Sequence, residues 1–208
     1  LGVQGLAYLF FAVTLLAYGV SVLRDRGRTV RGRNRPSRDT GTDTRLFLGA
    51  FSLLLMVSAT AYMVAPAGAY EFGVISTDTP SDRPDVILQG ESKNQTYIVP
   101  NGGLVPIHVF LEPGSEGIAI HPHEMVVGSH SQVNATVTVS VPPENGYYRR
   151  FLVEHRYLAV LPASTIRALY EFHPWTPIVV IDALIGGGFY LLGIALVGGG
   201  RVRSRKRT

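Results

Sequence analysis

The hydrophobic positions of this chain are gathered into three long stretches that are almost free of charge. Residues 1–23 and 46–65 contain no charged side chain, and residues 177–200 contain only Asp182. A helix needs about 20 mainly apolar residues to cross the hydrocarbon core of a bilayer. The pattern therefore predicts three transmembrane helices, at 1–23, 46–65 and 177–200.

The segment between the second and third stretches, 66–176, has a different pattern. Apolar and polar residues alternate there in short runs, most strictly from Val133 to Val141, and turn signals such as Asn101-Gly102-Gly103 separate the runs. Alternation is typical of strands with one buried face, so we expect the valines to be buried and Asn134 to be exposed. Strands are predicted at 70–75, 85–88, 94–99, 105–111, 117–120, 124–127, 132–141 and 149–160. Their number and spacing predict a mainly β domain, most simply an immunoglobulin-like β-sandwich, followed by a short helix at 162–172.

The charges are distributed unevenly over the 208 residues, whose net charge is +4. Residues 24–45 carry eight Arg and three Asp, and residues 201–208 carry five basic residues and no acidic one. The segment 67–176 is acidic, with eleven acidic and six basic residues. Because cytoplasmic loops of membrane proteins accumulate Lys and Arg, 24–45 is predicted as a cytoplasmic loop and 201–208 as a cytoplasmic tail. Segment 66–176 then lies outside, in a multi-pass protein of the plasma membrane.

Two other interpretations of these segments were weighed. Arg45, the second stretch and Ala67-Gly68-Ala69 together are similar to a cleavable signal peptide, but the apolar run is longer than usual and a span precedes it. The basic loop has no aromatic residues interleaved for base stacking, which argues against a nucleic-acid partner and leaves the lipid bilayer as the predicted one.

The residues that carry chemistry form no catalytic or metal-binding pattern. The chain has no Cys, which excludes disulfides and thiolate sites. His121-Pro122-His123 and His130 are spaced near one another, but the proline restricts their geometry, so neither a metal nor another cofactor is predicted. No nucleophile motif and no phosphate-binding loop is present. The glycine triplets 186–188 and 198–200 indicate close helix packing or flexibility, through pairs of small residues such as Ala183/Gly187 and Ala195/Gly199.

Three residues are candidates for a functional role. Asp182 lies inside the third span, where ionisable side chains are costly and often functional, although its position near the end leaves open that it simply reaches water. Asn94 and Asn134 begin Asn-X-Thr sequons in the segment predicted to lie outside, so they are possible glycosylation sites.

Several motifs resemble a known family. They are Asp82-Arg-Pro-Asp-Val, Asn101-Gly-Gly-Leu-Val-Pro, Gly146-Tyr-Tyr-Arg-Arg-Phe, Glu154-His-Arg-Tyr-Leu-Ala-Val-Leu-Pro and His173-Pro-Trp-Thr-Pro-Ile-Val-Val-Ile-Asp-Ala-Leu. With them the chain resembles the C-terminal region of haloarchaeal type I signal peptidases, the S26 membrane serine proteases. The resemblance extends over essentially the whole chain, but the Ser-Met box of the family's catalytic site is missing. No catalytic residue is therefore carried over.

Two hypotheses about function follow. The first is a membrane-anchored, non-catalytic region of a signal peptidase involved in processing secreted preproteins. The resemblance then implies an S26 protease domain before Leu1 as a partner in cis, and the secretion machinery as a further partner. The sequence begins with Leu rather than Met, which is the expectation if a further part of the protein precedes Leu1. The second is a stand-alone cell-surface β-sandwich with a binding or structural role.

Overall fold

The computed structural model describes residues 44–197, which form one compact unit from Arg45 onward. The predicted span 1–23, the predicted tail 201–208 and nearly all of the predicted loop 24–45 lie outside the described residues. Thr44 and Arg45, which the prediction gave to the loop, already belong to the first described helix, α2, at Thr44–Val64.

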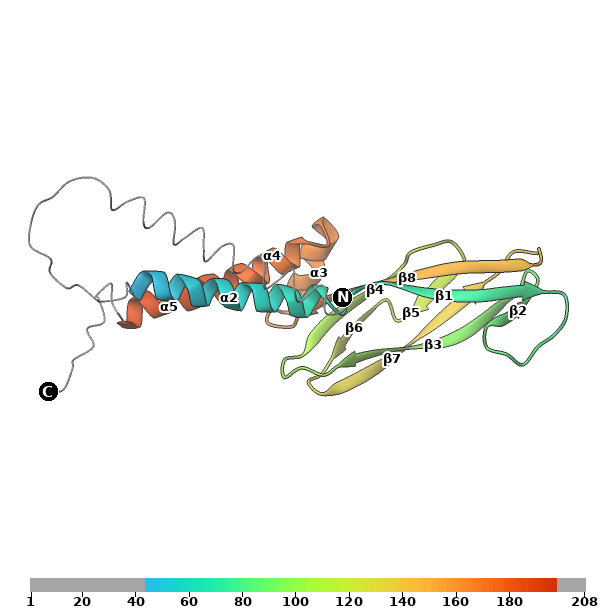
Figure 1. Cartoon of the computed structure of the whole chain (residues 1–208), viewed down its shortest axis with the longest axis horizontal. Coiled ribbons are helices and arrows are strands. Elements are labelled where there is room, and N and C mark those ends of the chain that lie inside the picture. Colours follow the sequence, from blue (N-terminus) through green and yellow to red (C-terminus); the bar gives the residue numbers. More distant parts are fainter. Residues whose placement is uncertain (1–43, 198–208) are drawn as a thin grey trace, which may run out of the picture. The chain divides into compact units, whose positions relative to one another are not determined.

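Eight strands and a group of short helices follow α2 (Figure 1). Each predicted strand is observed, with ends that differ by a few residues. The strands are β1 (Gly68–Thr77), β2 (Val86–Leu88), β3 (Ser92–Asn101), β4 (Ile107–Pro113), β5 (Ile118–His121), β6 (Glu124–Val127), β7 (Ser131–Ser140) and β8 (Gly146–Leu158). The helices are α3 (Ala163–Phe172), α4 (Thr176–Asp182), the π-helical turn η1 (Ala183–Gly187) and α5 (Gly188–Val197).

The strands form the predicted β-sandwich. One sheet has the order β2-β1-β8-β4-β6 and the other has the order β3-β7-β5 (Figure 1). The apolar faces of both sheets meet in one core, to which β7 contributes Ala135, Val137 and Val139. The alternation in β7 is confirmed, because these side chains are buried whereas Asn134 and Thr136 are exposed.

The order of the strands shows which strand pairs with the free edge of β8. An immunoglobulin sandwich has strands ABED in one sheet and CFG in the other, so its last strand G pairs with F. Here β3-β7-β5 correspond to B, E and D, and β4 and β8 correspond to C and F. The chain leaves β8 for α3, so within residues 44–197 no later strand fills the place beside β8. The first strand, β1, fills this place and runs antiparallel to β8 over Gly68–Ser76.

Strand β4 is covered on both faces. All residues from Ile107 to Leu111 are buried. Alternate side chains of a strand point to opposite faces. Val109 packs in the core between the sheets, whereas Phe110 packs on the other side with Ile166 of α3. Helix α3 thus forms a third layer over one end of the larger sheet. The sequence predicted this helix but gave no indication of the face that it covers.

Helix α2 and the chain from α4 to α5 are long and apolar enough to cross a membrane. The two segments, Arg45–Val64 and Thr176–Leu196, have mean hydropathies of 1.9 and 2.1. Only 17% and 22% of their residues are buried, so neither is the core helix of a soluble protein. These two helices coincide with two of the three spans that the sequence predicts, and the third, 1–23, lies outside the described residues.

The second of these segments contains an irregularity that the sequence analysis did not predict. Ala183–Gly187 form a π-helical turn between α4 and α5. The three glycines at 186–188 favour the helix least among ordinary residues, which makes a departure from α-helical geometry inexpensive there. The turn begins directly after Asp182 and carries Gly186 against α2.

Candidate functional site: the junction of the helices and the sandwich

The two long apolar helices contact each other through small and polar residues. Ser52 of α2 donates a hydrogen bond to the carbonyl of Gly186 at 2.6 Å. A Cβ atom on Gly186 would collide with Met56, and one on Gly193 would lie 2.6 Å from Leu48 Cδ2. Close packing through glycine is confirmed at Gly186 of the predicted triplet. The predicted pair Ala195/Gly199 extends outside the described residues, and the predicted pair Ala183/Gly187 is wrong. Ala183 is exposed, and a Cβ on Gly187 would meet nothing within 4 Å.

Asp182 lies inside this helix contact. Only 7% of its surface is exposed, and its carboxylate accepts a hydrogen bond from the Thr60 hydroxyl of α2. The possibility that Asp182 simply reaches water is therefore wrong, since α2 covers it. A hydrogen bond from Thr to a buried carboxylate satisfies part of its polarity where water is excluded. The structure gives Asp182 a place in joining the two helices.

The C-terminal end of α2 and the start of the second apolar helix, α4, share a hydrophobic core with the sandwich. Ala59 and Met63 of α2 and Ile178 and Ile181 of α4 belong to this core, with Phe110, Tyr157, Leu158 and Ile166 from the strands and α3. We call this set the junction core. Tyr157 is almost completely buried and donates a hydrogen bond from its hydroxyl to the Pro174 carbonyl at 2.7 Å. This core includes residues of the two apolar helices, of the larger sheet and of α3. The sandwich is therefore fixed to the helices by packing and not by a linker alone.

A second connection is made by Asn101 at the end of β3. Its side chain is buried, and its Oδ1 accepts hydrogen bonds from the Tyr62 hydroxyl of α2 at 2.5 Å and from the Gly103 N–H at 3.0 Å. Its Nδ2 donates to the carbonyls of Val105 and Gly128 at 3.0 and 2.9 Å. The Asn101 amide therefore connects the β3–β4 connection both to the β6–β7 turn and to the last turn of α2.

A charged pair lies in the sandwich close to this junction. Glu154 of β8 is buried, and it accepts hydrogen bonds from the Tyr97 hydroxyl at 2.6 Å and from Arg156. Arg156 also donates to the Pro100 carbonyl at 2.9 Å. Burial, and then the Glu154 carboxylate, raise the pKa of the Tyr97 hydroxyl above its usual value, so Tyr97 stays a donor. Every charge of this network has a partner, as buried ions require.

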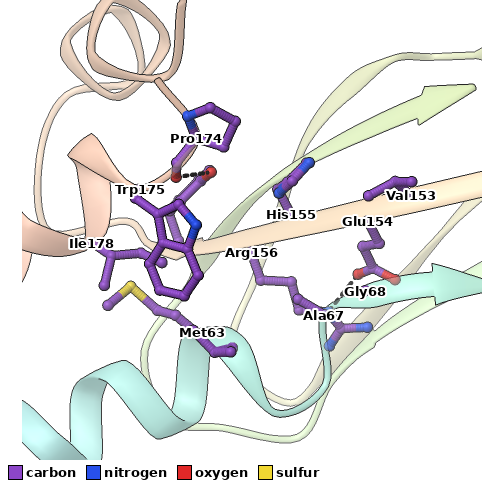
Figure 2. Close-up of a pocket in the computed structure, with 12 residues that line it drawn as sticks. Met63, Ala67, Gly68, Val153, Glu154, His155, Arg156, Pro174, Trp175 and Ile178 are labelled. Carbon is purple, nitrogen blue, oxygen red and sulfur yellow. Dashed lines mark hydrogen bonds and ion pairs between the residues drawn. The ribbon is translucent and has the colours of Figure 1, made fainter. Parts of the chain in front are cut away.

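A pocket of about 200 Å³ opens between the helices and β8. Figure 2 shows Met63, Trp175 and Ile178 on one side of it and the Glu154–Arg156 pair on the other. Most of its lining is apolar, and the carboxylate and guanidinium next to it already bind each other. The pocket therefore has the character of a packing gap at the junction and shows no set of groups that would perform catalysis.

Helix α3 is held on the sheet by a second polar cluster. Arg167 of α3 donates two hydrogen bonds to Glu124 of β6, at 2.8 and 2.9 Å, and buried His108 lies 2.6 Å from the same carboxylate. The Arg167 guanidinium holds the pKa of Glu124 below its usual value. Burial lowers the pKa of nearby His155. The Tyr170 ring of α3 stacks on Phe110, with centroids 4.1 Å apart.

The other histidines named in the sequence analysis are placed differently. His121, His123 and His130 are all exposed, and His123 Nδ1 lies 3.4 Å from the Leu111 carbonyl. Among residues 44–197, no three His, Cys, Asp or Glu side chains are arranged to hold a metal ion. Asn94 and Asn134 both lie exposed on the outer face of the β3-β7-β5 sheet, and Asn94 accepts a hydrogen bond from Thr138 at 2.7 Å.

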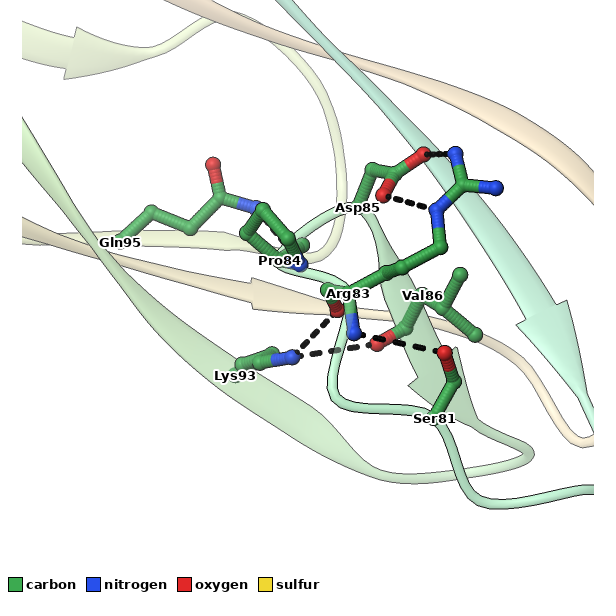
Figure 3. A network of polar contacts seen from close by, with 7 residues as sticks. All are labelled: Ser81, Arg83, Pro84, Asp85, Val86, Lys93 and Gln95. Carbon is green, nitrogen blue, oxygen red and sulfur yellow. Dashed lines mark hydrogen bonds and ion pairs between the residues drawn. The ribbon is translucent and has the colours of Figure 1, made fainter.

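The far end of the sandwich contains a third polar network, shown in Figure 3. Lys93 of β3 donates to the Arg83 carbonyl at 2.6 Å, Gln95 donates to the Pro84 carbonyl at 3.2 Å, and Arg83 forms an ion pair with Asp85. These bonds hold the connection from β1 to β2 against the edge of β3. Lys93 itself lies within β3.

Sequence reasoning missed the residues of the junction. Asn101, Glu154 and Tyr157 belong to motifs that carry the family resemblance, but these motifs gave no contact for them. Their partners Tyr62, Tyr97 and Pro174 are distant along the chain. One signal was available at Leu104-Val105, an apolar pair inside a turn that is otherwise rich in Gly and Asn. Such a pair needs a partner, and the described residues leave Leu104 mostly exposed.

The chain matches no known family model and no curated protein. Among solved structures it is similar to SSP-19, an MSP-domain protein of Caenorhabditis elegans (15% identity, 39% of this chain, 77% of that chain, TM-score 0.33). WR4, an MSP family member of the same organism, has 10% identity, with 44% and 75% covered and a TM-score of 0.30. PapD-like domain 7 of human CEP192 has 14% identity, with 44% and 82% covered and a TM-score of 0.27. Scores this low carry no argument about function.

Proposed function

We propose that this chain is a membrane-anchored, non-catalytic module that holds a β-sandwich at the outer surface of the plasma membrane. The observation that carries the proposal is the junction core. It joins the ends of two apolar helices to the larger sheet and to α3, so that packing holds the sandwich in a fixed position relative to these helices. In the complete proposal a third span, residues 1–23, adds to this anchor, and both basic segments lie in the cytoplasm.

We also propose that this module belongs to a type I signal peptidase and positions the protease where secreted preproteins leave the membrane. Three of the five motifs that carry the resemblance meet at the junction. The motif at Asn101 supplies the connection to α2, the motif at Glu154 supplies the end of β8, and the motif at His173 supplies the start of α4. These motifs support an anchoring role, since their residues bind one another across the junction.

The test is a cleavage assay with two samples. The natural protein that carries this chain, tagged after Thr208, should cleave a preprotein, whereas the 208-residue chain alone should not. We expect this difference because the protease domain would lie in another part of the natural protein. Cleavage by the chain alone that is lost when one of its own serines is replaced would contradict the non-catalytic assignment. A natural protein that does not cleave would favour a cell-surface binding protein instead.

A further inference from the structure

Two groups of apolar side chains stand exposed on rigid parts of the junction. The first is Leu104 with Val105 in the β3–β4 connection, and 82% of the Leu104 surface is exposed. This connection is held by the Asn101 side chain and by a hydrogen bond from the His130 N–H to the Gly103 carbonyl at 3.1 Å. Leu104 is thus presented outward by a fixed backbone, and it cannot bury itself by a simple collapse of the loop.

The second group is Phe172 with Trp175, at the corner between α3 and α4, where 84% and 54% of their surfaces are exposed. The corner is also fixed. Tyr157 binds the Pro174 carbonyl, and the Trp175 N–H donates to His173 Nδ1 at 3.2 Å. Helix α3 is anchored by buried Ile166 and by Arg167.

Both groups lie at the same level of the molecule. Leu104 follows Gly103, which lies against Tyr62 in the last turn of α2, and Trp175 directly precedes the first residue of α4. Segment Arg45–Val64 has 20 residues. At about 1.5 Å per residue it spans roughly 30 Å, the thickness of the hydrocarbon core. The C-terminal end of α2 and the N-terminal end of α4 therefore mark the outer boundary of the hydrocarbon core.

We propose that Leu104, Val105, Phe172 and Trp175 form a collar that enters the headgroup layer of the outer leaflet around the two spans. This inference rests on the proposed membrane anchoring and specifies which face of the sandwich meets lipid. We expect the bilayer to cover these side chains, because the proposed spans bring the lipid surface to the level of both groups. Aromatic and aliphatic side chains at the headgroup level are stabilised by partial burial there. The collar would prevent the sandwich from tilting on its anchor.

The test places a fluorescent label in the collar. The chain has no native Cys, so Leu104→Cys and Glu116→Cys each give one site for an environment-sensitive thiol dye. Glu116 is exposed in the turn after β4, at the end of that strand remote from α2. In phosphatidylcholine vesicles, the dye at 104 should emit at shorter wavelength and be quenched several-fold more by lipids with a quencher near the headgroup. The dye at 116 should behave as in water. Trp175, the single Trp, should be quenched by the same lipids.

Three results would overturn the collar, and they are distinguishable. If the chain resists alkaline extraction from the vesicles but the dye at 104 reports water, the anchor stands and the collar is wrong. If alkaline buffer extracts the chain, the membrane anchoring and the collar both fail. If the dye at 104 is shielded equally in detergent, without lipid quenching and in proportion to protein concentration, a second copy of the chain covers this surface instead.

Discussion

Val137→Asp should unfold the sandwich. Val137 is completely buried in β7, the central strand of its sheet, where it lies opposite Gln95 of β3 and Ile120 of β5. An aspartate there loses the packing of the valine and buries a carboxylate without a partner, which costs about 3–5 kcal/mol or more. Domains of this size are stable by only about 5–15 kcal/mol. In detergent micelles the variant should lose its β-sheet circular dichroism and become sensitive to protease between residues 66 and 176.

Thr136→Asp is the matched control, since it places the same charge one residue away on the exposed face of β7. This variant should unfold within a few degrees of the unmodified chain, because its carboxylate stays in water. Equal protease resistance of the two variants would mean that β7 does not face the core as described.

Glu154→Ala should lower the free energy of unfolding by about 3–5 kcal/mol, because it leaves the Arg156 guanidinium partly buried without its carboxylate. The Tyr97 hydroxyl loses its acceptor as well. For a chain of this length the loss corresponds to a decrease of roughly 6–20 °C in melting temperature. Thermal unfolding in micelles, followed by circular dichroism, measures it.

Glu71→Ala removes a pair of the same chemistry at the surface and serves as the comparison. Arg149 binds Glu71 with two hydrogen bonds of 2.6 Å, but both side chains are exposed to solvent. Exposed pairs contribute about 0–1 kcal/mol, so the melting temperature should fall by a few degrees at most. Similar losses in the two variants would show that burial of Glu154 has no special weight.

The sandwich could be predicted from the sequence because its signals are local. The alternation in β7 and the glycines and prolines between strands each act within a few residues, and every predicted strand is present. The pairing of β1 with β8 could not be predicted, since Gly68 and Glu154 meet only after the fold closes. The second covered face of β4 was missed for the same reason. His108 and Phe110 are buried by α3, which lies more than 50 residues later.

The contact between α2 and the segment from α4 to α5 could likewise be predicted only in part. Glycine in an apolar stretch correctly indicated close packing, but the choice of Gly186 and Gly193 over Gly187 depends on the face that α2 covers. The π-helical turn changes that face and has no simple sequence signal. The partner of Asp182 is Thr60, a single hydroxyl in α2. Leu104 could have been noticed as an apolar residue in a turn, whereas the contact of the preceding residue, Gly103, with Tyr62 required the structure.

The orientation of the chain in the membrane is the central claim, and single cysteines test it most directly. The chain has no Cys of its own, so each variant offers one thiol. An impermeant thiol reagent added to intact cells should label Glu116→Cys in the sandwich, and it should label Arg33→Cys and Arg205→Cys only after the membrane is permeabilised. Labelling of Arg33→Cys in intact cells, with Glu116→Cys protected, would contradict the account, because the sandwich would then face the cytoplasm.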